Sequence, residues 1–394
     1  MRLVVQKFGG TSVATPGSRE MVLKHVIKTK QEGYSPVVVV SAIGRRGDPY
    51  ATDTLLSLLE EAGGEVPARE RDLLMSCGEV ISAALVATLL NAKGHPAKAF
   101  TGGQAGILTD DRFGNAVIRE IKTDALINAV KQDYIPVVAG FQGMTENGDI
   151  TTLGRGGSDT TAVALGAALG AERVDIFTDV EGIMTADPRV VKGARILDTV
   201  TYREVTEMAY NGARVIHPKA VEIAMQYNIP VRVRSTFSDS PGTLITCGPE
   251  RLITGIAHIP HLAQISIKVP SGGDRGLEVR IFRILADAGI SIDLINVFPA
   301  LKIFTIKEEL VDKAVRVLEG IGVIPEVVRG LAKITVVGAG MRGVPGVMAR
   351  IIEALESENI EILQTSDSHT TISCLVRDKD AERAITALHR KFEL

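Results

Sequence analysis

Short apolar runs alternate with amphipathic stretches over about the first 245 of the chain's 394 residues, and this alternation restricts the possible folds most strongly. Several of the apolar runs carry no polar face, which is typical of strands in a parallel sheet that is buried on both sides. The intervening stretches read as helices: Pro16 fits a first turn behind Thr15, and Gly94 and Gly170 fit helix ends. The pattern predicts a doubly wound α/β sheet with helices on both faces. We expect strands at 3–8, 35–43, 97–100, 105–109, 135–141, 173–179, 229–235 and 242–246.

Ligands of such sheets bind beyond the carboxyl ends of the strands. Several glycines and polar or charged residues stand at these ends, so we expect a ligand site there. They are Lys7, Gly9, Gly10, Ser41, Gly140, Thr178 and Asp179.

After about Cys247 the chain contains an internal repeat. Segments that begin at Ala263 and Ala332 both read as strand, glycine-rich turn, amphipathic helix and strand, and each continues with a further strand and helix. The repeat length predicts two small βαββαβ units, at 263–330 and 331–394. The second copy reaches Leu394 without a last strand, so we expect the segment at 246–262 to be shared with it and the two units to interleave.

Composition excludes several classes of protein. The net charge is −3 with acids and bases interspersed, which argues against a nucleic-acid partner. Three widely spaced cysteines, Cys77, Cys247 and Cys374, form neither a disulfide framework nor a metal cluster. We find no signal peptide and no apolar run near the roughly 20 residues that cross a bilayer. We therefore expect a cytoplasmic protein without a membrane partner.

The first motif with chemical meaning is "KFGGTS", Lys7 to Ser12. A glycine pair allows backbone amides to approach an anion, and a lysine balances a transferring phosphate. The lysine precedes the glycines, so this is not the Walker pattern. An ordinary strand-end lysine and turn is an equally good interpretation of this motif alone.

The second motif is "GRGGSD", in which Gly154, Gly156 and Gly157 surround Arg155 and Ser158-Asp159 opens a helix. A helix start of this kind favours anions, and arginine grips a carboxylate or phosphate with two hydrogen bonds. A simple helix cap explains Ser158 or Asp159 but leaves Arg155 among three glycines unexplained. We therefore favour a functional loop.

Two further motifs are weaker. Thr178-Asp179 follows a buried strand, where an aspartate suits a nucleotide or a metal but is often only a turn residue. Glu79 begins an apolar helix, a position that the helix dipole favours without any ligand.

The segment from Gly338 to Gly343 matches G-x-G-x-x-G, with Glu361 downstream, and invites assignment as a dinucleotide site. Too little chain follows for such a domain, and Pro345 interrupts the entry to the helix. The first repeat carries a different glycine turn at this place. We interpret both turns as loops of small regulatory domains.

Taken together, "KFGGTS", "GRGGSDTTA", "FTDVEGI…ADPR", "GARVIHPKA" and the paired repeats resemble aspartate kinase over the whole length. The resemblance implies an amino-acid-kinase (carbamate-kinase-like) α/β/α sandwich at 1–245 and two ferredoxin-like ACT domains. It also implies the reaction of ATP, with Mg²⁺, and L-aspartate to 4-phospho-L-aspartate and ADP, a step in lysine, threonine and methionine biosynthesis.

The resemblance further implies roles for individual residues. Lys7 and Asp159 are the expected catalytic pair. An aspartate site is implied at Ser41, Thr52, Glu79, Arg155, Gly156, Gly157 and Ser158, and an ATP site at Lys7, Phe8, Gly9, Gly10, Thr178, Asp179, Met184, Arg189, Arg214 and Val215.

Two features depart from the family pattern. The sequence "RRGDPYATDTL" follows "SAIG", which leaves Thr52 and Thr54 as alternative contacts to aspartate, and the variant resembles a subset that includes diaminopimelate-sensitive forms. Met184 stands where a tyrosine is common, so stacking on adenine is not expected there. The sequence does not identify ligands for Mg²⁺.

The ACT resemblance implies an amino-acid effector, with lysine, threonine and diaminopimelate as candidates, and a homodimer through the ACT domains. Asp274, Gly276, Asp293 and Asn296 in the first repeat are the expected effector-binding residues. The repeats also fit a dimerisation module that binds no ligand. Two readings of the whole chain compete: a kinase of the same fold for glutamate, acetylglutamate or a nucleotide, and a catalytically inactive amino-acid sensor.

Overall fold

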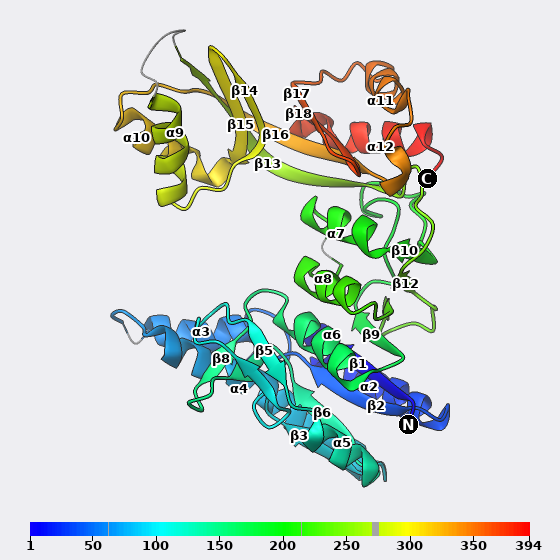
Figure 1. Cartoon of the computed structure of the whole chain (residues 1–394). Helices are drawn as coiled ribbons and strands as arrows, with labels where there is room; N and C mark the ends of the chain where they lie inside the picture. Colours follow the sequence, from blue (N-terminus) through cyan, green and yellow to red (C-terminus); the bar gives the residue numbers. More distant parts are fainter. Residues whose placement is uncertain (62, 214, 270–275) are drawn as a thin grey trace. The chain divides into compact units, whose positions relative to one another are not determined.

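The chain folds into two compact units, and the computed structural model describes residues 1–61, 63–213, 215–269 and 276–394 (Figure 1). The first unit comprises Met1–Ile183, Ile196–Ala209 and Arg214–Pro249. The second comprises Met184–Arg195, Tyr210–Ala213 and Glu250–Leu394. Two short segments before residue 245 thus belong to the second unit, whereas the predicted division placed them with the kinase domain.

The large sheet of the first unit has eight strands in the order β10-β12-β11-β9-β1-β2-β6-β3. All neighbouring pairs are parallel except β11 and β12, which confirms the mainly parallel sheet. The strands are β1 (Leu3–Phe8), β2 (Ser35–Val40), β3 (Ala97–Phe100), β6 (Ile135–Ala139), β9 (Arg173–Thr178), β10 (Thr199–Thr201), β11 (Val231–Ser235) and β12 (Thr243–Thr246).

Helices cover both faces of this sheet. Side chains of α2 (Pro16–Gln31) and α4 (Ala68–Ala92) share a core with Phe8 and Val38. Gly166 of α6 (Gly157–Leu169) lies close to Val5, and side chains alternate between faces along β1, so α6 covers the opposite face. The predicted α/β/α sandwich is therefore confirmed. The other helices of this unit are α1 (Gly10–Val13), α3 (Thr52–Glu61), α5 (Asp124–Lys131), α7 (Tyr202–Tyr210) and α8 (Pro218–Gln226).

The predicted helix ends have local causes in the structure. The Thr15 side chain accepts a hydrogen bond from the Ser18 amide at 3.1 Å, and the Ser18 hydroxyl accepts one from the Thr15 amide at 2.9 Å. This capping box fixes the start of α2, with Pro16 in its first turn. Gly170 ends α6 with a left-handed φ of 60°.

A second, smaller sheet of the first unit has the order β5-β4-β7-β8. Buried Asp72 of α4 fixes it, because its carboxylate accepts hydrogen bonds from the Thr152 amide at 2.7 Å and from the Gly114 amide at 2.9 Å. Only one of these four strands was predicted from the sequence. Their bounds are β4 (Ile107–Thr109), β5 (Ile118–Ile121), β7 (Gln142–Met144) and β8 (Ile150–Thr152).

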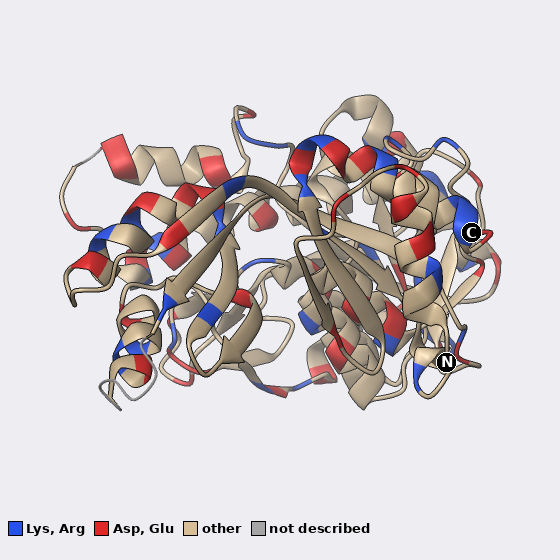
Figure 2. Ribbon diagram, turned by 90° about the horizontal axis from the view of Figure 1, so that it is seen from above, with Lys and Arg blue, Asp and Glu red and all other residues tan. Residues whose placement is uncertain are grey.

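Helix α4 is long and apolar enough to cross a membrane by length and composition. The expectation that no apolar run approaches that length was therefore wrong. In the structure α4 is a core helix: Ala83, Val86 and Leu90 pack under β2 and β6, and Asp72 and Glu79 are buried polar residues on the same helix. Along the described helices, Lys and Arg are interspersed with Asp and Glu (Figure 2).

The second unit is built on one six-stranded sheet, in the order β14-β15-β13-β16-β18-β17. All its neighbouring strands are antiparallel. Its elements are β13 (Gly255–Lys268), α9 (Leu277–Asp287), β14 (Asp293–Phe298), β15 (Leu301–Lys307), α10 (Val311–Glu319), β16 (Glu326–Val337), α11 (Val347–Glu356), β17 (Gln364–Asp367), β18 (Thr371–Arg377) and α12 (Ala381–Lys391).

Two long strands join the repeats. The first half of β13 pairs with the strand of the second repeat, from Gly255 opposite Val337 to Ile259 opposite Lys333. The second half of β13 pairs with β15 of the first repeat and with the start of β16. The strand exchange that the interleaving hypothesis required is thus present in the structure.

The glycine-rich segment after β16 is filled by the chain itself. A Cβ atom on Gly338 would lie 2.0 Å from the Leu252 carbonyl oxygen, and the Gly340 amide donates to the Arg251 carbonyl at 2.8 Å. The close approach that the glycines allow is therefore used by backbone, which agrees with a structural loop rather than a dinucleotide site. The corresponding turn of the first repeat lies outside the described residues.

Candidate active site

A pocket of about 550 Å³ opens in the first unit at the carboxyl ends of β1 and β2. It gathers residues from the N-terminal turn, the loop after β2, helix α4 and the start of α6. Ten of the predicted site residues line it: Lys7, Gly10, Ser41, Thr52, Glu79, Arg155, Gly156, Gly157, Ser158 and Asp159.

Lys7 and Asp159 form an ion pair in this pocket. Lys7 is the penultimate residue of β1, Asp159 lies in the first turn of α6, and Lys7 Nζ is 2.7 Å from Asp159 Oδ1. Both side chains are only 12–13% exposed, so solvent screens the pair weakly. The carboxylate fixes the direction of the ammonium group, and its Oδ2 accepts a bond from the His217 amide at 3.4 Å.

The Gly9-Gly10 turn lies directly beside this lysine. A Cβ atom on Gly10 would lie 2.5 Å from the Gly44 carbonyl oxygen, so only glycine allows the loop after β2 to pack there. The Gly9 amide donates to the Phe177 carbonyl at 3.3 Å, and it is therefore already engaged rather than free for a phosphate as expected. Phe8 is fully buried and stacks on Phe177 at 4.6 Å between ring centroids, so its side chain belongs to the core.

The glycine loop before α6 depends on close packing. Gly156 has a φ of 72°, and a Cβ atom there would lie 2.2 Å from the ring of His217. A Cβ atom on Gly157 would lie 2.6 Å from the ring of Phe141. Arg155 lies between Gly154 and Gly156, is exposed, and forms no hydrogen bond or ion pair with the described residues. The loop thus presents a guanidinium group that is available to an anion.

Glu79 lies in the middle of α4 (Ala68–Ala92) and not at a helix start as predicted, so its carboxyl group is buried away from the helix N-terminus. Its Oε1 accepts a hydrogen bond from the Ala42 amide at 3.1 Å, while Oε2 is buried and has no hydrogen-bond partner in the described structure. Burial raises the pKa of Glu79 to about 8. An unpartnered carboxylate oxygen that faces a pocket is well suited to a cationic ligand group, because the ligand would supply the missing donor.

The loop after β2 distinguishes the two candidate threonines. Thr52 lines the pocket, whereas the Thr54 hydroxyl accepts a bond from the Gly47 amide at 3.2 Å and does not line it. Ser41 lines the pocket as well, and its amide donates to the Phe8 carbonyl at 3.1 Å. This geometry favours Thr52 over Thr54.

Several predicted ATP-binding residues do not line this pocket. Asp179 is paired with Arg45, with Arg45 Nη2 and Asp179 Oδ2 2.6 Å apart, and Thr178 donates to the same carboxylate at 3.2 Å. Met184 and Arg189 belong to the second unit, where Arg189 pairs with Asp187 at 2.6 Å. Arg214 lies outside the described residues, and Val215 is not among the lining residues.

The structure adds residues that the sequence analysis did not name for the site: Ala42, Gly44, Arg45, Arg46, Ala51, Asp53 and Phe141. Gly154, which was expected in the functional loop, lines the pocket as well. For Arg45 and Arg46 the sequence signal was the charged stretch "RRGD", which follows a predicted strand end after Gly44. Among the described residues, no cluster of three His, Cys, Asp or Glu side chains could hold a metal ion.

Three of the four predicted effector residues are described by the structure, and they lie in the second unit. Asp293 pairs with Lys333, which is buried, and Asn296 Oδ1 accepts a bond from Gln364 Nε2 at 2.6 Å. Gln364 also accepts from Gln264 at 2.9 Å, so these groups link the two repeats. Gly276 is the N-cap residue of α9, and Asp274 lies outside the described residues.

Comparisons with known proteins agree with this architecture. The model of the amino acid kinase family matches residues 2–235, and an ACT domain model matches 326–390. Aspartokinase 1 of Bacillus subtilis (strain 168) is 50% identical over 404 residues and is matched along all of both chains.

Two solved structures of E. coli aspartokinase III are also similar. The complex with aspartate and ADP (R-state) has a TM-score of 0.78 and 28% identity, with all of both chains covered. The complex with lysine and aspartate (T-state) has a TM-score of 0.79 and 29% identity, and covers 98% of this chain and 99% of that one.

Proposed function

This chain belongs to the aspartokinases, within the amino acid kinase family, and from that premise we propose how its pocket transfers the terminal phosphoryl group of ATP to the side-chain carboxylate of L-aspartate. The observation that carries the proposal is the composition of one pocket. It combines a lysine fixed by an aspartate, a free arginine and an unpartnered buried carboxyl group. These groups match the anions and the ammonium group of the two substrates.

The chemistry needs charge compensation rather than a general base. The side-chain carboxylate of aspartate is already ionised at pH 7. One of its oxygens attacks the terminal phosphorus of ATP, and the bond from that phosphorus to the bridging oxygen breaks to release ADP. Lys7 offsets the negative charge of the transferring group, while Asp159 holds the ammonium in place. Positioning of the two anions supplies most of the remaining rate enhancement.

Two groups bind the amino-acid end of the substrate. Arg155 pairs with the α-carboxylate, because it is a lining guanidinium beside the start of α6, on a loop fixed by the packing of its glycines, and has no partner among the described residues. Glu79 Oε2 accepts a hydrogen bond from the α-ammonium group, and this bond gives the buried oxygen the partner that it lacks in the structure. Ser41 and Thr52 line the same pocket and supply hydroxyl groups to the substrate.

Mg²⁺ enters this account as part of the nucleotide substrate. The lining acids are Asp53, Glu79 and Asp159, and Asp159 is engaged by Lys7. Such a site fits an ion held largely by phosphate oxygens and water, with at most one protein carboxylate. Asp53 is the exposed acid that remains for this role.

The second unit senses an amino acid and joins two copies of the chain. The solved relative with bound lysine supports an amino-acid effector of this class, and the predicted residues Asp293 and Asn296 lie where the two repeats are linked. A homodimer through this unit, a cytoplasmic location and a role early in lysine, threonine and methionine biosynthesis complete the proposal.

The proposal is tested by ADP release with L-aspartate, L-glutamate and N-acetylglutamate as acceptors, each with Mg²⁺ and ATP. We expect turnover with aspartate and little with the other two. Preference for glutamate or acetylglutamate would assign the pocket to another kinase of the fold. No ADP release with any of the three acceptors, together with binding of an effector, would favour the inactive sensor.

A further inference from the structure

The loop after β2 brings two arginines to the pocket, Arg45 and Arg46, and the function proposed above leaves both unused. Of the four cationic lining residues, Lys7 is paired with Asp159 and assigned to the transferring phosphoryl group, and Arg155 is assigned to the aspartate carboxylate. The triphosphate of ATP brings several negative charges into the same space. Arg45 and Arg46 are therefore the lining cations that remain, beside Mg²⁺ and Lys7, for the phosphate groups of the nucleotide.

The backbone of Arg45 is fixed in place. The Gly44 amide donates to the Gly10 carbonyl at 3.1 Å, which ties the loop to the N-terminal glycine turn. The Arg45 amide donates to Asp48 Oδ2 at 2.7 Å, and the Asp48 amide returns a bond to the Arg45 carbonyl at 2.9 Å. Because these hydrogen bonds hold the loop on both sides of Arg45, the side chain of Arg45 starts from a fixed backbone position.

The side chain of Arg45 lies beside the strand end where a nucleotide is expected. Its Nη2 is 2.6 Å from Asp179 Oδ2, and Asp179 directly follows β9, the neighbour of β1 in the sheet. The arginine is 71% and the aspartate 45% exposed, so solvent weakens this pair. A phosphate with two acceptor oxygens would compete well for the same guanidinium.

We propose that Arg45 binds a phosphate group of ATP and that Asp179 holds it ready in the empty enzyme. The inference rests on the proposed function, because it concerns the nucleotide of the same reaction. The phosphate is favoured over the aspartate substrate because the loop is tied to the Gly9-Gly10 turn and to the end of β9. The charged groups assigned to aspartate, Glu79 and Arg155, by contrast, lie on α4 and in the loop before α6.

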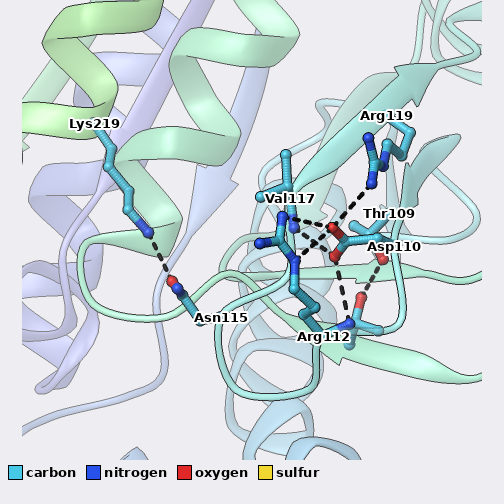
Figure 3. A network of polar contacts seen from close by, with 8 residues as sticks. Thr109, Asp110, Arg112, Asn115, Val117, Arg119 and Lys219 are labelled. Atoms are coloured by element: carbon cyan, nitrogen blue, oxygen red, sulfur yellow. Dashed lines mark hydrogen bonds and ion pairs between the residues drawn. The ribbon is translucent and has the colours of Figure 1, made fainter. Parts of the chain in front are cut away.

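The test compares Arg45→Ala and Arg45→Lys with the wild type in steady-state kinetics. Adenosine, which carries no phosphate, serves as a competitive probe of the rest of the nucleotide site. Arg112→Ala is the matched control, because Arg112 is also an exposed arginine, 63% accessible, whose Nη2 is 2.9 Å from Asp110 Oδ2 in the same unit but outside the pocket (Figure 3).

We expect Arg45→Ala to raise the KM for ATP about tenfold or more, as loss of a charge-assisted hydrogen bond would, and Arg45→Lys to recover part of it. The KM for aspartate, the inhibition constant of adenosine and all constants of Arg112→Ala should stay within about twofold of the wild type. An unchanged KM for ATP in Arg45→Ala would overturn the inference, and so would an equal loss of adenosine binding. If the wild type itself formed no ADP with aspartate, the proposed function would fail first.

Discussion

At the scale of single residues, burial determines the chemistry of Glu79. The carboxyl group is 3% exposed, and one of its oxygens lacks a partner. Its pKa of about 8 means that the empty pocket holds it mostly protonated at pH 7. An ammonium group binds the ionised form, so aspartate binding must remove the proton.

We therefore predict that aspartate binds more tightly as the pH rises toward 8. The KM for aspartate should fall by about fivefold between pH 7 and pH 8, since the ionised fraction of a group with a pKa of about 8 rises by about that factor across this range. The KM for ATP should change much less. Initial rates with each substrate varied in turn at several pH values measure both trends.

Glu79→Gln is the control for this prediction. The amide keeps the shape of the side chain but does not titrate, so the variant should bind aspartate weakly and without this pH dependence. The same slope in Glu79→Gln as in the wild type would assign the titration to another group.

The sequence placed several residues in the pocket but missed others. Lys7, Arg155 and Asp159 were predictable because each stands at a strand end or helix start, where parallel sheets bind ligands. Arg45 was not, because its partner Asp179 lies 134 positions away. Nor does the sequence indicate that the Gly9 amide is used by Phe177, because that bond depends on the packing of β9 beside β1.

At the scale of elements, the loop at 154–157 is shaped by what surrounds it. Gly154 and Gly156 adopt left-handed conformations, and Gly156 packs on the ring of His217. The peptide amide of the same histidine donates to Asp159. The segment before α8 (Pro218–Gln226) thus supports both the loop that carries Arg155 and the partner of Lys7.

We predict that Gly156→Ala impairs aspartate binding and stability together. The left-handed φ costs about 1–2 kcal/mol for a residue with a Cβ atom, and the clash with His217 adds to it. The KM for aspartate should rise and the Tm should fall. Gly148→Ala is the matched control, since its φ is 88° but nothing lies within 4 Å of an added Cβ atom. Equal effects of the two substitutions on KM would argue against support from His217.

The long buried elements were predictable and the short ones were not. Strands such as β1 and β6 have continuous apolar sequences, whereas β5, β7 and β8 are only three or four residues long and lack a distinct period. The missing last strand of the second repeat did indicate an exchange, because a sheet edge without its strand needs a donor. No local sequence pattern indicated that one long strand, β13, would pair with strands of both repeats.

At the scale of the whole molecule, the segment Met184–Arg195 lies with the second unit although it falls inside the region matched by the kinase family. Its Ala186 and Val191 join the core of the second repeat, and the Thr185 hydroxyl is 2.9 Å from His389 Nε2 of α12. Sequence reasoning could not foresee this, since the two partners are 204 residues apart. Met184 and Arg189, which the sequence analysis expected to bind ATP, therefore lie in the same short segment as residues of the core of the second unit.

We predict that an amino-acid effector changes the activity through the second unit. In the structure, Asp293 and Asn296 are occupied by Lys333 and Gln364, so an effector must exchange with these internal partners. Lysine, threonine and diaminopimelate, singly and in pairs, should include one that changes turnover or KM by roughly 5- to 150-fold. Asn296→Ala should weaken that response without lowering basal turnover. No change in rate or Tm with any of them would leave only a scaffold role.

The central claim is that Lys7, held by Asp159, makes the reaction of two anions possible. Lys7→Ala leaves Asp159 without its partner, so the double variant Lys7→Ala, Asp159→Asn is needed as a control for the unpaired charge. Arg155→Ala provides the contrast, because it should chiefly raise the KM for aspartate. Thermal melts of each variant confirm that the fold is retained.

The most direct test is the turnover of Lys7→Ala at saturating ATP and aspartate. We predict that kcat falls by about 10²- to 10³-fold, as it does when a group that stabilises transition-state charge is removed, while both KM values change little. Near-normal turnover in this variant would contradict the account.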